Sequence, residues 1–234
     1  MNQPVKHPSP PLPLLAGVHL ALFMAGLAVS TALAGGAVFP SPFDPVHAAG
    51  YFAAHASAVE VASFFLFGSA VPLGLFAATA SSRLAFFGVR VAGVNIAAFG
   101  GYGAALMLLL SGSCMWALGQ PGVGALPEAV RVLHLLAFAT GGPGFAVTFG
   151  LLVLGVSLAG GLTRHLPRWL MGSGLAIGVI AELSSLSLLS QSAAVLLPLT
   201  RFPGLIWLVS VAVCLPAARE REPVLEREPA RAEG

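Results

Sequence analysis

The chain has 234 residues, of which 57% are hydrophobic and only 9% are charged, with a mean hydropathy of +0.90. Soluble domains carry roughly 25% charged residues, so this composition excludes a water-soluble fold. The formal net charge is +2, and the basic residues are scattered between apolar runs, which excludes a nucleic-acid-binding surface. Two cysteines are too few for a disulfide framework. We therefore predict an all-α polytopic membrane protein with one membrane domain, residues 14–216.

Six apolar segments are long enough to cross a bilayer, because about 20 helical residues at 1.5 Å per residue span ~30 Å of hydrocarbon. Connectors rich in Pro, Gly or Arg separate them, where turn chemistry places the breaks. In chain order the predicted spans are residues 14–34, 57–80, 91–111, 129–155, 169–190 and a last, shorter one that ends near Pro216.

The connector after the first span contains Asp44 followed by Pro45. Asp is a favoured N-cap residue and Pro a favoured first helical residue, so this pair predicts a helix start. The helix that begins there carries His47 and His55, and we expect it to lie at the outer membrane interface.

The distribution of basic residues predicts the orientation, since cytoplasmic loops are enriched in Lys and Arg. Nine of the eleven Lys and Arg fall on one side, in the two terminal segments and the second and fourth loops; Arg131 and Arg201 fall on the other. We therefore expect both termini in the cytoplasm. Residues 1–13 form a Pro-rich N-terminal segment, and residues 217–234 form a charged tail with too little apolar content to fold.

Ionisable side chains inside membrane spans are costly and are functional-site candidates by default. Here they are Glu60, Arg131, His134, Glu182 and Arg201. Helical spacing places them toward the outer leaflet, which leaves two interpretations open. They form structural ion pairs, for instance Glu60 with Arg131 and Glu182 with Arg201, or they surround a polar cavity that binds a small anion or a proton-coupled substrate.

The last span is irregular around Arg201, which lies between Pro198 and Pro203. Residues 202–216 cover only about 22 Å, so either the span extends back through Arg201 or the bilayer is thinned there. We expect residues 193–200 to be broken or re-entrant. The sequence Gly141-Gly142-Pro143-Gly144 predicts a second break, and paired interruptions of this kind are typical of transporter sites.

A metal site is the main alternative for the polar residues, since His47, His55 and His134 could supply three ligands with a glutamate as base. Their spacing matches no known metal motif. A haem between His19 and His134 is excluded, because His19 falls near the inner end of the first span and His134 near the outer end of the fourth. The sequence therefore predicts no bound cofactor and no catalytic residue.

Three short motifs resemble a bacterial family of six-span membrane proteins, the domain of unknown function 4386 family. They are Leu166-Pro167-Arg168-Trp169, Glu182-Leu183-Ser184 and the run from Leu197 to Gly204. The resemblance implies the six-span topology and a bacterial inner membrane. It implies no activity and assigns no binding residues.

The functional hypothesis is a non-enzymatic inner-membrane protein, either an accessory or sensor subunit or a small carrier with an outward-facing polar pocket. Its partners are the lipid bilayer and a small molecule or ion. The alternative is a membrane-embedded, metal-dependent enzyme with a periplasm-facing His and Glu site.

Overall fold

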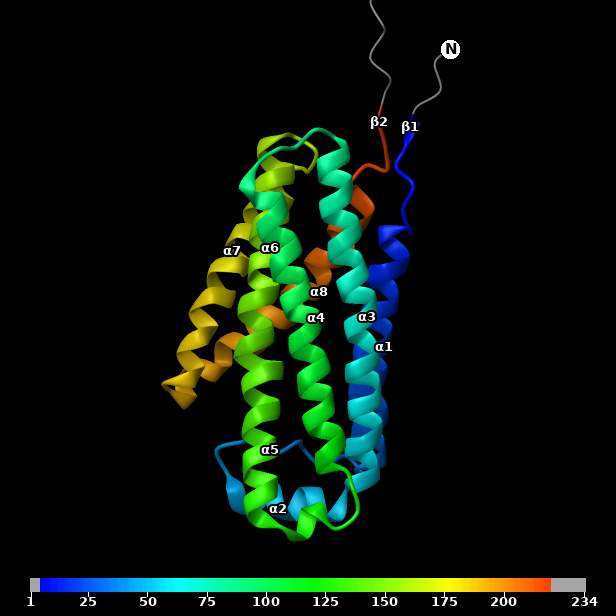
Figure 1. Ribbon diagram of the computed structural model, residues 1–234. Helices are drawn as coiled ribbons and strands as arrows, with labels where there is room; N and C mark the ends of the chain where they lie inside the picture. The colour runs from blue at the N-terminus through cyan, green and yellow to red at the C-terminus, as the bar shows by residue number, and fades with distance from the viewer. Residues whose placement is uncertain (1–4, 220–234) are drawn as a thin grey trace, which may run out of the picture.

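The computed structural model describes residues 5–219, which form a bundle of long helices (Figure 1). Within these residues, six helical runs are long and apolar enough to cross a membrane. The predicted fold, an all-helical polytopic bundle with six spans, is confirmed. The spans are Leu12–Leu33 (α1), Ala56–Phe86 (α3), Ala92–Leu118 (α4), Pro127–Leu162 (α5 to α6), Arg168–Leu188 (α7 and a short turn) and Gln191–Cys214 (a short turn and α8).

Three of these spans are composite. A π-helical turn, η2 (Thr140–Gly144), joins α5 (Pro127–Ala139) to α6 (Phe145–Leu162). α7 (Arg168–Leu183) continues into the 3-10 turn η3 (Ser184–Leu188), and the 3-10 turn η4 (Gln191–Val195) precedes α8 (Leu196–Cys214). The remaining elements are α2 (Pro45–Ala54), the 3-10 turn η1 (Val123–Ala125) and the two-residue strands β1 (Val5–Lys6) and β2 (Ala218–Arg219).

The short helix α2 begins where the sequence predicts. The Asp44 carboxylate accepts a hydrogen bond from the backbone N–H of His47 at 3.1 Å, and Pro45 is the first helical residue. This cap satisfies one of the free N–H groups of the first turn. α2 lies across the end of the bundle opposite the chain termini (Figure 1), which we call the distal end; the other is the terminal end.

Several helices extend beyond the predicted spans. α3 has 31 residues and α4 has 27, so they measure about 46 and 40 Å and exceed ~30 Å of hydrocarbon. The predicted second span stopped at Ala80 because Ser81, Ser82 and Arg83 resemble a connector. In the structure Arg83 is buried, and its contacts allow the helix to continue to Phe86.

The predicted break at residues 193–200 is misplaced. The chain is extended at Ser190, with φ −142° and ψ 123°, and helical structure resumes with η4. α8 begins at Leu196 and runs through Arg201, so the span does extend back through this residue. Pro198 causes no interruption because it lies in the first turn, where its missing N–H would have no intrahelical acceptor.

The six spans pack in sequence order around a common core, with α8 returning to contact α1. α4 and α6 approach closely at Gly93 and Gly155, which face each other. A Cβ atom added to Gly155 would lie 2.5 Å from the backbone nitrogen of Ala97 and 2.5 Å from the carbonyl oxygen of Gly93. Small residues allow such contacts, which supply much of the attraction between helices in a membrane.

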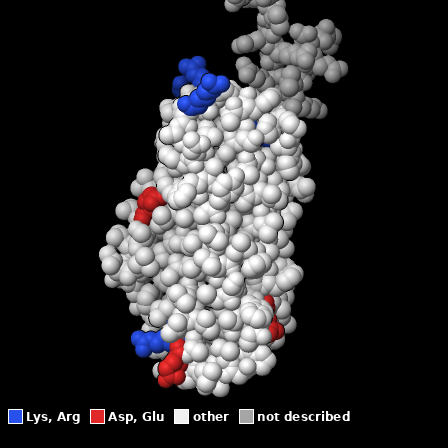
Figure 2. All heavy atoms as spheres, in the orientation of Figure 1, with Lys and Arg blue, Asp and Glu red and all other residues white. Residues whose placement is uncertain are grey.

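The hairpin of α7 and α8 stops short of the distal end, where the chain from α1 to α2 and α2 itself cover the bundle (Figure 1). Trp169 and Trp116 are 61% and 58% exposed near the terminal and distal ends, as is typical of residues that anchor a protein at membrane interfaces. On the face shown in Figure 2, charged side chains are few and lie mostly near the two ends of the bundle, apart from one acidic side chain at the left edge partway along it.

The two chain ends meet at the terminal end. β1 pairs antiparallel with β2, with Lys6 opposite Ala218. The buried Arg83 guanidinium donates to the Ser9 hydroxyl at 3.2 Å and to the Pro10 carbonyl at 3.1 Å. Both ends therefore lie on the same side of the bundle, as six spans require. The predicted disordered tail, residues 217–234, lies almost entirely outside the described residues.

We predict that docking of the N-terminal segment weakens as the pH falls below the ordinary His pKa of 6.5. Desolvation and the nearby Arg83 charge lower the pKa of His7, whose Nε2 lies 3.0 Å from the Ser82 hydroxyl. The undocked segment then binds the proton more readily, so protonation favours undocking.

Hydrogen exchange at the His7 amide, which donates to the Ala217 carbonyl, measures this docking. Protection, corrected for intrinsic rates, should be lower at about pH 5 than at about pH 7.5. The difference should disappear in His7→Phe. An unchanged difference in that variant would mean that another group titrates.

Candidate functional site

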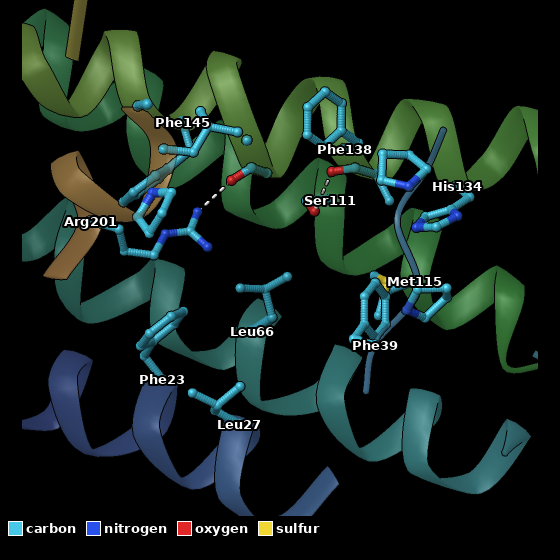
Figure 3. A pocket seen from close by; sticks show the side chains of 18 of the residues that line it. Phe23, Leu27, Phe39, Leu66, Ser111, Met115, His134, Phe138, Phe145 and Arg201 are labelled. Carbon is cyan, nitrogen blue, oxygen red and sulfur yellow. Dashed lines mark hydrogen bonds between the residues drawn. The ribbon is translucent and has the colours of Figure 1, made fainter. Parts of the chain in front are cut away.

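A cavity of about 410 Å³ lies between the distal parts of the helices (Figure 3). Its wall combines α1, α3, α4, α5, η2, α6, the first turns of α8 and the segment 39–42. The volume falls within the range of small-molecule sites, and the lining is mostly apolar, as such sites usually are. Its main apolar residues are Phe23, Leu27, Phe39, Leu66, Phe138 and Phe145.

Arg201 supplies the charge of this cavity. Its guanidinium donates a hydrogen bond to the Gly141 carbonyl and lies over two aromatic rings, with Cζ 4.5 Å from the ring centroid of Phe145 and 5.3 Å from that of Phe23. Such cation–π contacts stabilise a partly desolvated cation. Phe23 is near the middle of the 22-residue α1, so Arg201 lies about half a span from either end, deeper than the predicted outer interface.

The π-helical turn explains why a backbone carbonyl is free to bind Arg201. The N–H of Phe145 donates to the carbonyls of Thr140 and Gly142 rather than to that of Gly141, four residues earlier. Pro143, which has no N–H, lies inside the turn. The predicted break at residues 141–144 is therefore a π-helical turn within a continuous helical run, and π-turns of this kind often mark functional sites.

His134 lies at the opposite end of the cavity from Arg201 (Figure 3). It is 4% exposed, and its ring packs edge-on against Phe52 and Phe39, at centroid distances of 5.0 and 5.7 Å. Between the two ends, the Ser111 hydroxyl donates to the Ala137 carbonyl at 2.9 Å and links α4 to α5. The cavity thus has a cationic end, a histidine end and an aromatic middle.

Of the five predicted site residues, the structure brings only His134 and Arg201 to this cavity. In place of a pair with Arg131, the Glu60 carboxylate accepts a hydrogen bond from the Gln120 amide at 3.3 Å. It borders a separate open groove of about 840 Å³ between α3 and α4. Arg131 is exposed near the start of α5. The sequence predicts one shared site because helical spacing shows which residues lie on the same face of a helix. It does not show which neighbouring helix that face contacts.

The predicted pair of Glu182 with Arg201 is also replaced. Glu182 turns from α7 toward α6, where its Oε1 lies 3.4 Å from the position of a Cβ added to Gly150. This oxygen is buried and has no hydrogen-bond partner among the described residues. Glu182 therefore faces the α6–α7 contact, away from the cavity.

The three histidines considered as metal ligands differ in their surroundings. His47 is exposed on α2, the His55 ring lies 4.8 Å from that of Tyr51, and His134 is buried among aromatic rings. Within residues 5–219, no group of three or more His, Cys, Asp or Glu side chains could hold a metal ion. The described part of the chain therefore offers no support for the metal-dependent alternative.

Sequence reasoning missed the residues that accompany Arg201. Phe23 and Phe145 look like ordinary lipid-facing or packing residues in apolar spans, and the Gly141 carbonyl carries no side-chain signal. In the sequence, the run Gly141-Gly142-Pro143-Gly144 does predict an irregular backbone at residues 141–144, where the π-turn lies.

Comparison with known proteins gives no relative from which a role could be transferred. No family model, no curated protein and no solved structure matches the chain. A function therefore has to be argued from the chemistry of the site.

Proposed function

We propose that the protein is a non-enzymatic, multi-pass protein of a bacterial inner membrane that binds a small ligand in the Arg201 cavity, as a sensor or a small carrier. The observation that carries this proposal is the guanidinium at mid-span, beside a mostly apolar cavity of about 410 Å³. A cation at this depth is costly and is kept where it has a role. The coexistence of the cation and an apolar space favours ligand binding over simple helix packing.

The orientation and the family are parts of the same proposal. The basic residues of the terminal segments and of two loops support a cytoplasmic location for both ends. The motifs at residues 166–169, 182–184 and 197–204 support membership of the domain of unknown function 4386 family. Neither point assigns an activity.

A thermal-shift screen of the purified protein tests ligand binding. The screen compares small anionic, cationic and neutral amphipathic compounds on the wild type and on Gly142→Phe. The atoms nearest to a Cβ at Gly142 would belong to side chains, Leu197 at 3.3 Å and Phe138 at 3.4 Å, so the added ring should occupy the cavity. At least one class should raise the melting temperature of the wild type and not of this variant.

Leu189→Phe is the matched control, because it adds an aromatic ring at a side chain that is 87% exposed. It should respond to ligands as the wild type does. If no class stabilises the wild type, or if Gly142→Phe responds equally, the cavity is not a ligand site and the proposal fails.

A further inference from the structure

The function proposed above leaves the ligand unidentified, and the surroundings of Arg201 narrow its chemistry. On the basis of that function, we propose that the cavity binds a single-chain amphiphile with an oxyanion head, a carboxylate or a phosphate, whose head pairs with Arg201. The chain of this ligand occupies the aromatic part of the cavity.

The charge of Arg201 is only partly compensated. A guanidinium has five N–H donors arranged in a fork that matches an oxyanion in two-point contact. Within residues 5–219, the structure gives it one hydrogen bond, to Gly141, and the faces of Phe145 and Phe23. Glu182, the acidic residue expected to pair with it, faces α6 instead. An oxyanion would supply the missing negative charge.

The rest of the cavity selects against a bare inorganic anion. Such an ion would lose its water on entry and would find few donors besides Arg201, because most of the lining is apolar. Phe23, Phe138 and Phe145 offer apolar surface beside the charge. This combination fits a ligand with one charged end and one apolar end, and about 410 Å³ suits one chain rather than two.

The freed Gly141 carbonyl holds the guanidinium of Arg201 at the cavity. This carbonyl accepts the hydrogen bond from Arg201, which spares the guanidinium from having no acceptor at this depth. An arriving oxyanion exchanges with this neutral acceptor. A hydrogen bond between two charged groups is stronger than one to a carbonyl, so the exchange favours binding.

The position of the cavity also fits a ligand that arrives from the bilayer. The α7–α8 hairpin ends short of the distal end (Figure 1), and among the described residues the first turns of α8 and the segment 39–42 line the cavity between α1 and α5. A second hollow of about 200 Å³ shares Phe23, Leu27 and Arg201 and reaches Thr31 and Tyr51. This second hollow therefore extends from Arg201 toward the distal end of the bundle.

Binding to the full-length protein in zwitterionic nanodiscs tests the proposal, with four probes: decanoate, decyl phosphate, 1-decanol and inorganic phosphate. Decanoate and decyl phosphate should bind the wild type about tenfold or more tightly than the neutral alcohol or the chain-free anion, the difference expected for one charged hydrogen bond. Arg201→Gln should lose this preference for the charged head. Arg201→Lys, which keeps the charge without the fork, should retain part of it.

Arg131→Gln is the matched control, because it removes the same charge from an exposed site outside the cavity, and it should bind decanoate as the wild type does. Equal binding of decanoate and 1-decanol to the wild type would overturn the anionic head while leaving ligand binding intact. Equal losses in Arg131→Gln and Arg201→Gln would overturn the role of Arg201. If Arg201→Gln does not fold, the comparison of decanoate with 1-decanol on the wild type still tests whether the site prefers a charged head.

The source of the oxyanion is tested in nanodiscs that contain phosphatidylglycerol, a two-chain anionic lipid. Decanoate affinity should be unchanged there if the site takes a single chain. Displacement of decanoate by the bilayer lipid would overturn the single-chain assignment. If inorganic phosphate competes with decanoate as strongly as decyl phosphate does, the alkyl chain contributes nothing, and the site is one for a small anion.

Discussion

Replacement of Gly155 by leucine is expected to lower the stability of the bundle by about 3 kcal/mol or more, at the upper end of overpacking effects. The added Cβ would lie 2.5 Å from the backbone nitrogen of Ala97 and 2.5 Å from the Gly93 carbonyl. Backbone atoms cannot rotate away as a side-chain tip can, so α4 and α6 must separate. Thermal unfolding in detergent, followed by tryptophan fluorescence, measures the loss.

Gly172→Leu is the control for this experiment. Gly172 is exposed on α7, and a Cβ there would have nothing within 4 Å. Its substitution should not lower stability and should raise it by up to about 1 kcal/mol, because a glycine inside a helix is less favourable than leucine by about that amount. Equal losses in the two variants would show that the α4–α6 contact does not determine the stability of the bundle.

Replacement of Glu182 by leucine is expected to raise stability by about 1–3 kcal/mol, the cost of a buried polar group without a partner. The buried Oε1 has no hydrogen-bond partner among the described residues and lies against α6. The midpoint of unfolding in mixed micelles measures the change. Glu182→Gln, which keeps a polar group in place, should gain less.

Glu128→Leu provides the comparison, because Glu128 is an exposed carboxylate in the first turn of α5. It should change stability by no more than about 0.5 kcal/mol. A loss of stability in Glu182→Leu would contradict the prediction and would indicate that the carboxylate is paired, since breaking a buried ion pair is strongly destabilising.

The six-span fold could be predicted because it depends on composition and on the length of apolar runs, both of which are local properties. Helix ends were less predictable, since they depend on distant contacts. Arg83 looks like a loop residue by composition, yet it is buried because Ser9 and Pro10, more than 70 positions away in the chain, accept its hydrogen bonds.

The candidate site was predicted only in part, for a related reason. Arg201 and His134 stand out because ionisable residues are rare in apolar spans, and both line the cavity. Their surroundings did not stand out. The presence of acidic residues at a similar depth predicts carboxylate partners for Arg201. In the structure its partners are two phenylalanine rings and a backbone carbonyl that the π-turn leaves free. Phenylalanine is common in every span, and a backbone carbonyl has no signature in a sequence.

The pairing of β1 with β2 has a mechanical consequence for the bundle. It links the segment before α1 to the segment after α8, so the first and last spans are held together at the terminal end. Toward the distal end, between α1 and α5, the segment 39–42 and the first turns of α8 complete the wall of the cavity. A carrier that rocks one half against the other would therefore have its hinge at the terminal end and would open the cavity between the segment 39–42 and the first turns of α8.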